Sequence, residues 1–312
     1  MHRRALLAIL TVPLVRPAFA QAAVFPPGSA VGLLPPAGMR PADGFTGFQD
    51  SGAGASVLIA ELPPAAYAAI STLDDAAFQQ RQNITVTARR ALKLADAGAQ
   101  AMLLTGTQRA GGVLYRKYIL LAGTPALTAV VTMQVPDTSA AYPGRLAEAT
   151  MQSVAFRPAP SLDEKVRALP FTLRDMAGFR VSQTLAGNGL ILTEGPLDVV
   201  RDAEQPVMVV VFQRAPEVPP GSRDAFARSR LNAARLADPA IVRNEGFTLR
   251  GGEWHVIEAN GNDAGTGRAH YTMQVLRFVP GGFMQALGIA RVEGREALAP
   301  RFRRTAEGME PR

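Results

Sequence analysis

Histidine offers the widest chemistry of any side chain in this sequence, and it is scarce. The sequence holds three histidines; His2 lies at the N-terminus, so only His255 and His270 lie in the body of the chain. An imidazole can act as an acid, a base or a metal ligand near neutral pH. If a hairpin pairs position 255 with position 272, both imidazoles project from one face of a sheet, whereas a shift of one residue separates them. With the neighbouring Trp254 and Tyr271, they form the candidate ligand-binding set.

These four residues also have a plainer, structural interpretation. Two histidines without a carboxylate or cysteine nearby make an incomplete zinc site, so no metal is predicted. Trp254, the single tryptophan, alternates with Val256 and is placed to pack against Tyr271 and Met273. Such a set is typical of a hydrophobic core, with the floor of an apolar ligand pocket as the alternative.

Two pairs of acidic residues are the other candidates for chemistry. Asp74-Asp75 and Asp163-Glu164 resemble the paired carboxylates of hydrolases or of calcium sites. Each pair, however, opens a segment with helical pattern, where the helix dipole favours negative charge. We therefore predict that both pairs stabilise helix starts.

The motifs of common enzyme classes are missing from the sequence. It has no Gly-x-Ser-x-Gly elbow and no phosphate loop, and Gly187-Asn188-Gly189 and Gly265-Thr266-Gly267 lack the third glycine of a dinucleotide fingerprint. It also has no cysteine, which excludes disulfides, thiol catalysis and zinc–thiolate sites. We predict no catalytic residue and no cofactor.

The N-terminus has the three parts of a secretory signal peptide. Arg3 and Arg4 precede a short apolar run, and Ala18-Phe19-Ala20 follows as a small-x-small cleavage site. The apolar run is too short to span a bilayer. We expect residues 1–20 to be removed, with cleavage after Ala22 as the alternative, and the remainder to be periplasmic.

Charge adds little to this assignment. Removing three arginines with the leader leaves 30 basic residues against 26 acidic ones, a net charge of +4. Export argues against nucleic acid as a partner, and no transmembrane segment is predicted after the leader. The closing segment mixes six arginines with four glutamates, which fits a solvated helix face or weak contact with anionic surfaces. The arginines are Arg291, Arg295, Arg301, Arg303, Arg304 and Arg312.

The rest of the sequence runs through one order of elements twice. Each half begins with Ala-Gly-x-Arg, at Ala37–Arg40 and at Ala177–Arg180. A strand pair, a helix, three strands joined by glycine turns and a closing helix then follow in both halves. The first pair is expected over residues 44–50 and 55–62, and the turns of the second half at Asn260–Asp263 and Pro280–Gly282. The break falls at a proline-punctuated stretch, which predicts modules over residues 21–157 and 162–312 with a linker over 158–161.

The middle helices are the weakest elements of this pattern. We expect one helix over residues 74–98, although Ile84-Thr85-Val86-Thr87 suits a helix poorly. The other is expected to start after Ser222 and to run to Asp238, with Pro239 as the stop.

A repeated string offers a rival alignment of the halves. Thr132-Met133-Gln134-Val135 recurs as Thr272-Met273-Gln274-Val275. Trusting it would match the third strand of the first meander with the second strand of the other. We treat the match as coincidence, because the order of hairpins fixes a sheet and a four-residue identity does not.

This order of elements resembles the PsbP-like superfamily. The resemblance rests on the pattern from Trp254 to Gly261, continuing into Tyr271 to Leu276 and the closing helix. It implies an α+β fold, with each module a twisted antiparallel sheet flanked by helices. Members include a photosystem II subunit, a fungal Ran-binding protein and bacterial envelope proteins, and they offer no shared catalytic residues.

The predicted function is therefore that of an exported, non-catalytic accessory or binding protein of the periplasm. Its partner is an unidentified envelope protein or a small ligand, and its oligomeric state is not predicted. One alternative is an envelope hydrolase that uses paired carboxylates. The other is a small-molecule or metal carrier that uses the second module.

Overall fold

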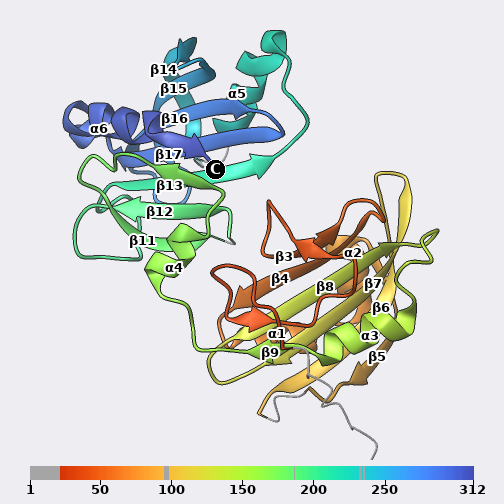
Figure 1. Ribbon diagram of the computed structural model, residues 1–312. Coiled ribbons are helices and arrows are strands. Elements are labelled where there is room, and N and C mark those ends of the chain that lie inside the picture. The colour runs from red at the N-terminus through yellow and green to blue at the C-terminus, as the bar shows by residue number, and fades with distance from the viewer. Residues whose placement is uncertain (1–21, 95–97, 186, 232–233, 235) are drawn as a thin grey trace, which may run out of the picture.

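The computed structural model describes residues 22–94, 98–185, 187–231, 234 and 236–312, so the predicted leader over 1–20 lies outside the described residues. Two antiparallel sheets of seven strands dominate the molecule, one in each half of the chain (Figure 1). Among the described residues, no helix is long and apolar enough to span a membrane. The chain is thus a tandem pair of α+β modules, as the sequence predicts.

The first module is built on the sheet β2-β3-β4-β8-β7-β6-β5. Its strands are β2 (Arg40–Pro41), β3 (Gly47–Asp50), β4 (Ala55–Leu62), β5 (Ile84–Ala91), β6 (Gln100–Ala110), β7 (Val113–Gly123) and β8 (Thr128–Pro136). Helix α3 (Gly144–Gln152) packs on one face through Ala147 and Met151. Helices α1 (Ala66–Ser71) and α2 (Asp75–Gln82) cover the other face, where Phe78 enters the core.

The second module repeats that order as β11-β12-β13-β17-β16-β15-β14. Its strands are β11 (Arg180–Leu185), β12 (Gly189–Thr193), β13 (Val207–Arg214), β14 (Leu236–Leu249), β15 (Gly252–Asp263), β16 (Ala269–Val279) and β17 (Gly282–Arg291). Helix α6 (Arg295–Glu307) covers one face through Phe302, and α5 (Arg223–Leu231) covers the other through Ala227. Short 3-10 turns, η1 (Pro220–Ser222) and η3 (Val292–Gly294), precede these two helices.

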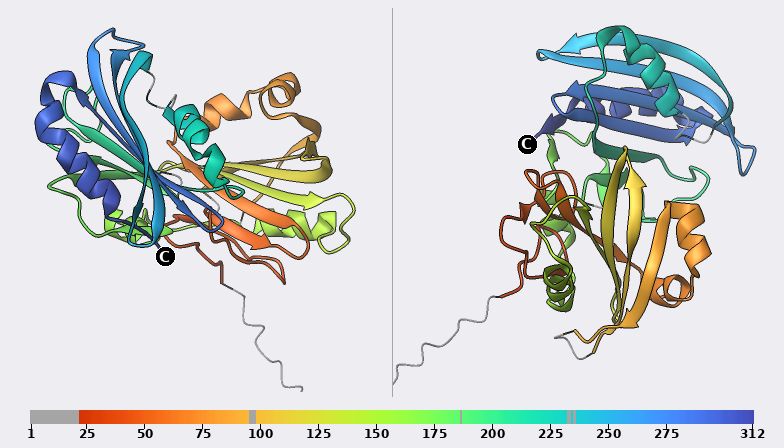
Figure 2. Two further views of the ribbon diagram at one scale, coloured as in Figure 1. Left: turned by 90° about the horizontal axis from the view of Figure 1, so that it is seen from above. Right: turned by 90° about the vertical axis from the view of Figure 1, so that its right-hand side faces the viewer.

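Each module closes by pairing its first strand with its last. Strand β1 (Val31–Gly32) pairs with β9 (Ala155–Phe156), and β10 (Phe171–Leu173) pairs with β18 (Met309–Pro311). Helix α4 (Leu162–Arg167) lies between the two closures. The views in Figure 2 show the two sheets as separate bodies that meet along one side.

The predicted middle helices were wrong in their second halves. Helix α2 ends at Gln82 and α5 ends at Leu231, and each is followed by an edge strand, β5 or β14. All four residues from Ile84 to Thr87 are β-branched, which favours a strand over a helix. Pro239 lies within β14, where a bulge between Ala237 and Ala240 and the free sheet edge remove the need for its N–H. The meander therefore has four strands in each module.

The preference for element order over the repeated string is confirmed. Thr132 to Val135 lie in β8, next to β4, whereas Thr272 to Val275 lie in β16, between β15 and β17. The two strings thus occupy different places in the two sheets.

Candidate functional site

The two modules touch at a few points around residues 41–47 of the first module. The Arg214 guanidinium at the end of β13 donates to the backbone oxygen of Asp43 at 2.7 and 3.1 Å. Thr46 packs so closely on Gly187 that a Cβ at Gly187 would lie 2.4 Å from the Thr46 hydroxyl. Gly187 also has φ +74, so this contact requires glycine for two reasons.

Arg157, directly before the linker, contacts both modules. The Arg157 side chain donates to the backbone oxygen of Ser29 at 2.7 Å and pairs with Glu164 of α4 at 2.5 Å. Its guanidinium also lies over the Phe25 ring, 5.4 Å from the centroid. Pairing and stacking of one arginine therefore connect the first module to the helix that opens the second.

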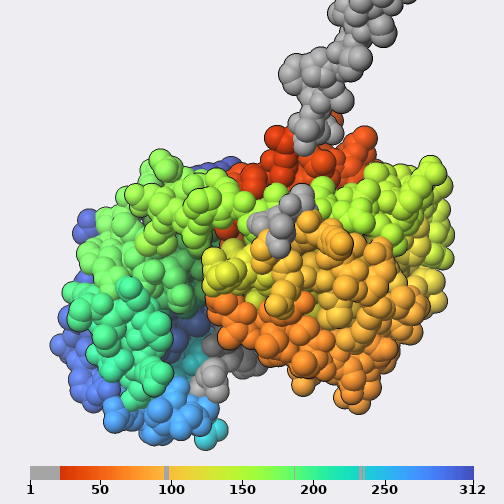
Figure 3. All heavy atoms as spheres, turned by 90° about the horizontal axis from the view of Figure 1, so that it is seen from below, coloured from red at the N-terminus to blue at the C-terminus, as the bar shows by residue number. Residues whose placement is uncertain are grey.

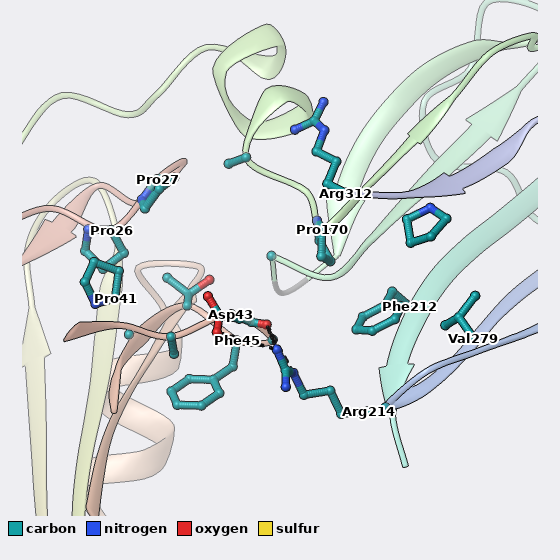
Figure 4. Close-up of a pocket in the computed structure, with 18 of the residues that line it drawn as sticks. Pro26, Pro27, Pro41, Asp43, Phe45, Pro170, Phe212, Arg214, Val279 and Arg312 are labelled. Atoms are coloured by element: carbon teal, nitrogen blue, oxygen red, sulfur yellow. Dashed lines mark hydrogen bonds and ion pairs between the residues drawn. The ribbon is translucent and has the colours of Figure 1, made fainter. Parts of the chain in front are cut away.

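A cavity of about 410 Å³ lies between these contacts (Figure 4). Its lining is mostly apolar and includes six prolines together with Phe45, Phe212 and Val279. The prolines are Pro26, Pro27, Pro41, Pro170, Pro280 and Pro311. Pro280 and Gly281 form the tip of the β16–β17 hairpin, so a turn predicted from the sequence reaches the other module here. Proline carries no N–H, so this wall offers few hydrogen-bond donors.

A second cavity of about 340 Å³ adjoins the first and shares Pro27, Thr46, Ala168 and Gly187 with it. One of its walls is β4, from Leu58 to Leu62. Leu58 is 45% exposed, which is unusual for a leucine in the middle of a sheet. We call the two cavities together the inter-module cleft, and the space-filling view shows a deep hollow between the modules (Figure 3).

The charges of the inter-module cleft are largely engaged by neighbours. Arg214 lies 3.9 Å from the Asp43 carboxylate, and Arg312 donates to the backbone oxygen of Leu169. Glu61 accepts from the Ser29 hydroxyl and from the Ala30 N–H, both at 2.7 Å. The cleft is therefore suited to binding apolar groups rather than to transferring protons.

The histidines of the candidate set share a face but do not meet. His255 lies opposite Leu276 and His270 lies opposite Gly261, so the assumed pairing of 255 with 272 was wrong. Both side chains project from the α5 face of the second sheet, near opposite ends of the β15–β16 hairpin. The two imidazoles therefore cannot bind one ion together.

Each histidine has a polar neighbourhood of its own. His255 Nε2 lies 2.7 Å from the Asn244 side-chain oxygen. His270 Nε2 lies 3.4 Å from Asp202, and the same carboxylate also holds Arg268 at 2.7 Å. Asp202 belongs to the connection 195–205, for which the first module has only the short turn between β3 and β4.

Trp254 and Tyr271 lie on the opposite face of the sheet, within the core that packs on α6. The Tyr271 hydroxyl donates to the buried Glu258 at 2.8 Å, and burial followed by this bond raises the pKa of Tyr271. Trp254 Nε1 donates to the Leu249 backbone oxygen. The prediction that these aromatic residues pack in the core is confirmed.

The acidic pairs act as predicted at helix starts. Asp74 caps α2 by accepting from the Ala77 N–H at 2.7 Å, and Asp75 pairs with Arg89. Asp163 and Glu164 lie in the first turn of α4. No group of three or more histidine, cysteine or acidic residues is placed to hold a metal ion in the described part of the chain.

Sequence reasoning missed the inter-module cleft. It predicted the Pro280-Gly281 turn and the proline-punctuated break between the modules, but a sequence pattern carries no information on which of these segments meet. The contact of Arg214 with Asp43 spans 171 positions.

Comparison with known proteins adds likeness of fold only. No protein-family model matches the chain, and no curated protein matches it in sequence. The apo immunity protein TplEi of the type VI secretion system of Pseudomonas aeruginosa is similar over 93% of this chain and 97% of its own, at 9% identity and a TM-score of 0.36. LpqN of Mycobacterium tuberculosis, involved in cell envelope biogenesis, is similar over 45% and 81%, at 15% identity and a TM-score of 0.36. Cyanobacterial PsbP of Synechocystis sp. PCC 6803 is similar over 46% and 87%, at 9% identity and a TM-score of 0.33. A PsbP-like protein is thus among the structures that this chain weakly resembles in fold.

Proposed function

We propose that this protein is an exported accessory protein of the periplasm, which binds apolar side chains of a partner protein in the inter-module cleft and catalyses no reaction. The observation that carries the proposal is the apolar, proline-lined cavity of about 410 Å³ at the junction of the modules. Cavities of this size, mostly apolar with a few polar groups at the margin, are typical of binding sites.

Exposed apolar surface beside the cavities supports the same proposal. The exposed Leu58 beside the second cavity supplies apolar surface that an occupant would cover.

The cleft geometry supports binding better than hydrolysis. Its two carboxylates, Asp43 and Glu61, line different cavities, and each is engaged by a neighbour. A hydrolytic pair needs two carboxyl groups on either side of one substrate bond. Export rests on the N-terminal sequence pattern of residues 1–20.

The test is site-specific photocrosslinking in cells that express the full-length chain. A photoreactive phenylalanine analogue at position 45 or 58 should crosslink to one defined protein in the periplasmic fraction. The matched control is position 242, because Val242 on β14 is exposed to 48%, close to the 45% of Leu58. Intact mass of the recovered protein should show cleavage after Ala20 or Ala22.

A second variant connects the crosslink to the cleft. Phe212→Asp places a charge in the first cavity and should abolish the crosslink at position 58 while the protein remains folded. Equal crosslinking at positions 58 and 242, or retention of the uncleaved leader in the cytoplasm, would overturn the proposal. A small ligand retained in native mass spectrometry in place of a crosslinked protein would assign the cleft to a small molecule.

A further inference from the structure

A separate pocket of about 330 Å³ lies in the second module beside His255. Its walls come from the turn before α5, the start of α5 and the β14–β15 hairpin. The lining residues are Pro220, Arg223, Asp224, Gly246, Phe247, Thr248, Glu253, Trp254 and His255. It therefore includes two of the residues that the sequence marked as candidates, and none of the residues of the inter-module cleft.

A chain of hydrogen bonds fixes the protonation of the His255 ring. The Asn244 amide N–H donates to Asp224 at 2.5 Å, so its nitrogen is oriented toward α5 and its oxygen toward the histidine. That oxygen lies 2.7 Å from His255 Nε2 and can only accept, so Nε2 carries the proton. A neutral ring has one proton, which leaves Nδ1 as a bare acceptor.

Nδ1 lies beside Gly246, on the pocket side of the ring. A Cβ built at Gly246 would lie 3.7 Å from Nδ1, so glycine leaves the space in front of this nitrogen open. Among the described residues, no donor forms a hydrogen bond with Nδ1. The pocket therefore contains an oriented acceptor without a partner.

The surroundings of the ring favour its neutral form. Burial lowers the pKa of His255 below its usual value of 6.5, and nearby Arg228 acts in the same direction. The other charged groups near the ring, Asp224 of α5 and Glu245 of β14, oppose this shift but do not reverse it. Nδ1 is thus available as an acceptor at neutral pH.

The remaining walls of the pocket mix donors and acceptors. The Thr248 hydroxyl bonds to Glu253 at 3.2 Å, and Arg223 lies 3.3 Å from the same carboxylate. Asp224 and Glu253 disfavour an anion, while Arg223 disfavours a cation. An alcohol both donates and accepts, so a ligand with several hydroxyl groups matches all of these walls.

We propose that this pocket binds a saccharide, with one hydroxyl group donating to His255 Nδ1 and others bonding to Glu253, Thr248 and Arg223. The volume is at the lower end of the range of ligand pockets, about 300–1,000 Å³, which fits a small sugar unit. The site has no counterpart in the first module, because residues 22–157 contain no histidine.

The experiment is NMR of the leaderless protein labelled with ¹⁵N-histidine. Only His255 and His270 then give signals, and His270→Gln assigns them. The expected result is an Nε2–H tautomer for His255 at pH 7, and a saturable shift of Nδ1 when glucose, galactose, mannose or N-acetylglucosamine is titrated into the millimolar range. Either a protonated Nδ1, or no saturable shift with any of these sugars, would overturn the proposal.

Two variants separate binding from folding. Gly246→Val should fill the space before Nδ1, leave the tautomer unchanged and weaken sugar binding at least about tenfold, which corresponds to 1.4 kcal/mol. Asn244→Asp should bring a second carboxylate to Nε2, raise the pKa of His255 and convert Nδ1 to a donor. Asp202→Asn, at the other histidine, is the matched control and should change neither the His255 signals nor binding. Unchanged sugar binding in Gly246→Val would contradict the assigned site.

Discussion

The two modules share one topology but fix the same turn with different side chains. In the first module, the Tyr142 hydroxyl bonds to the Ala37 backbone oxygen at 3.3 Å and to Asp50 at 2.6 Å. In the second, the Arg301 guanidinium bonds to the Ala177 backbone oxygen at 2.9 Å and to Glu194 at 2.6 Å.

The turn itself is the repeated Ala-Gly-x-Arg sequence. Gly38 has φ +93 and Gly178 has φ +86, so both positions need glycine. Each turn leads into an edge strand, and the acid lies at the end of the next strand or directly after it. The fold thus requires a donor between a turn carbonyl and an acid, but not a particular residue type.

The sheet faces that pack on the middle helices, α2 and α5, differ more between the modules than the turns do. In the first module, the buried Lys117 donates to Gln134 at 2.6 Å. On the corresponding strands of the second, Gln285 donates to Gln274, which donates to the Ala227 backbone oxygen of α5. The second module therefore has a pair of amides on the strands where the first holds a lysine, and its charge comes from the helix, since Arg230 of α5 donates to Gln285 at 3.4 Å. The two modules thus keep one topology while their side chains differ, and the pocket proposed beside His255 is found on the second module alone.

The largest expected effect tests whether the modules fold as separate units. Phe302 is fully buried and stacks on Phe179 with ring centroids 5.5 Å apart. Phe302→Ala should destabilise the second module by about 3–5 kcal/mol. Met151→Ala, at a fully buried position of α3, should destabilise the first by about 2–5 kcal/mol. Calorimetry should show one transition shifted in each variant, and a common shift of all transitions would show that the modules unfold together.

The sequence revealed those elements of the fold that local patterns determine. Strand β4 was predicted with its observed bounds, because Val57, Leu58 and Ile59 form a short apolar run that is typical of a strand. The closing helices and the turn at Pro280-Gly281 were predicted for similar local reasons, whereas the turn predicted at Asn260–Asp263 was wrong, because these residues extend β15 and the chain turns after them. The pairs β1–β9 and β10–β18 join distant positions, and no local pattern indicated them.

The edge strands show why a local pattern can mislead. β5 and β14 are mostly exposed and carry bulges, so they lack the strict alternation of a half-buried strand. Their charged residues and Pro239 protect a free edge from pairing with other chains, and the same residues look like a polar helix and its stop. The site residues were harder still, because the tautomer of His255 depends on Asn244, which lies on a strand that was not predicted.

The next effect concerns the buried Lys117 of the first module. Burial lowers the pKa of Lys117, so the unfolded chain binds a proton more tightly at this group than the folded chain does. Stability of the first module should therefore rise as the pH rises through the folded pKa toward the ordinary value of 10.5. Lys117→Met with Gln134→Leu should remove this rise and stabilise the module by on the order of 1–2 kcal/mol.

The control for that pair lies in the second module. Gln274→Met with Gln285→Leu removes a neutral pair, so it should leave the pH dependence of both transitions unchanged. Thermal unfolding followed across alkaline pH measures the pH dependence of stability in both double variants. If stability still rises with pH in the lysine variant, the rise belongs to another group.

The smallest expected effect returns to the turn that the modules fix differently. Tyr142→Phe removes a hydroxyl that donates to Asp50, and it should destabilise the first module by about 1 kcal/mol. Burial, followed by the bond to Asp50, raises the pKa of Tyr142 from 10.0 to about 12. The unfolded chain therefore loses this proton first, so native stability should fall between pH 10 and pH 12. The second module has an alkaline decline of its own, because the pKa of Tyr271 is raised by burial and by its bond to Glu258. Arg301→Met should destabilise the second module without changing that decline, because a guanidinium keeps its protons at alkaline pH. If the first module still shows its decline in the Tyr142→Phe variant, the turn of the first module does not depend on the hydroxyl, and the analogy between Tyr142 and Arg301 fails.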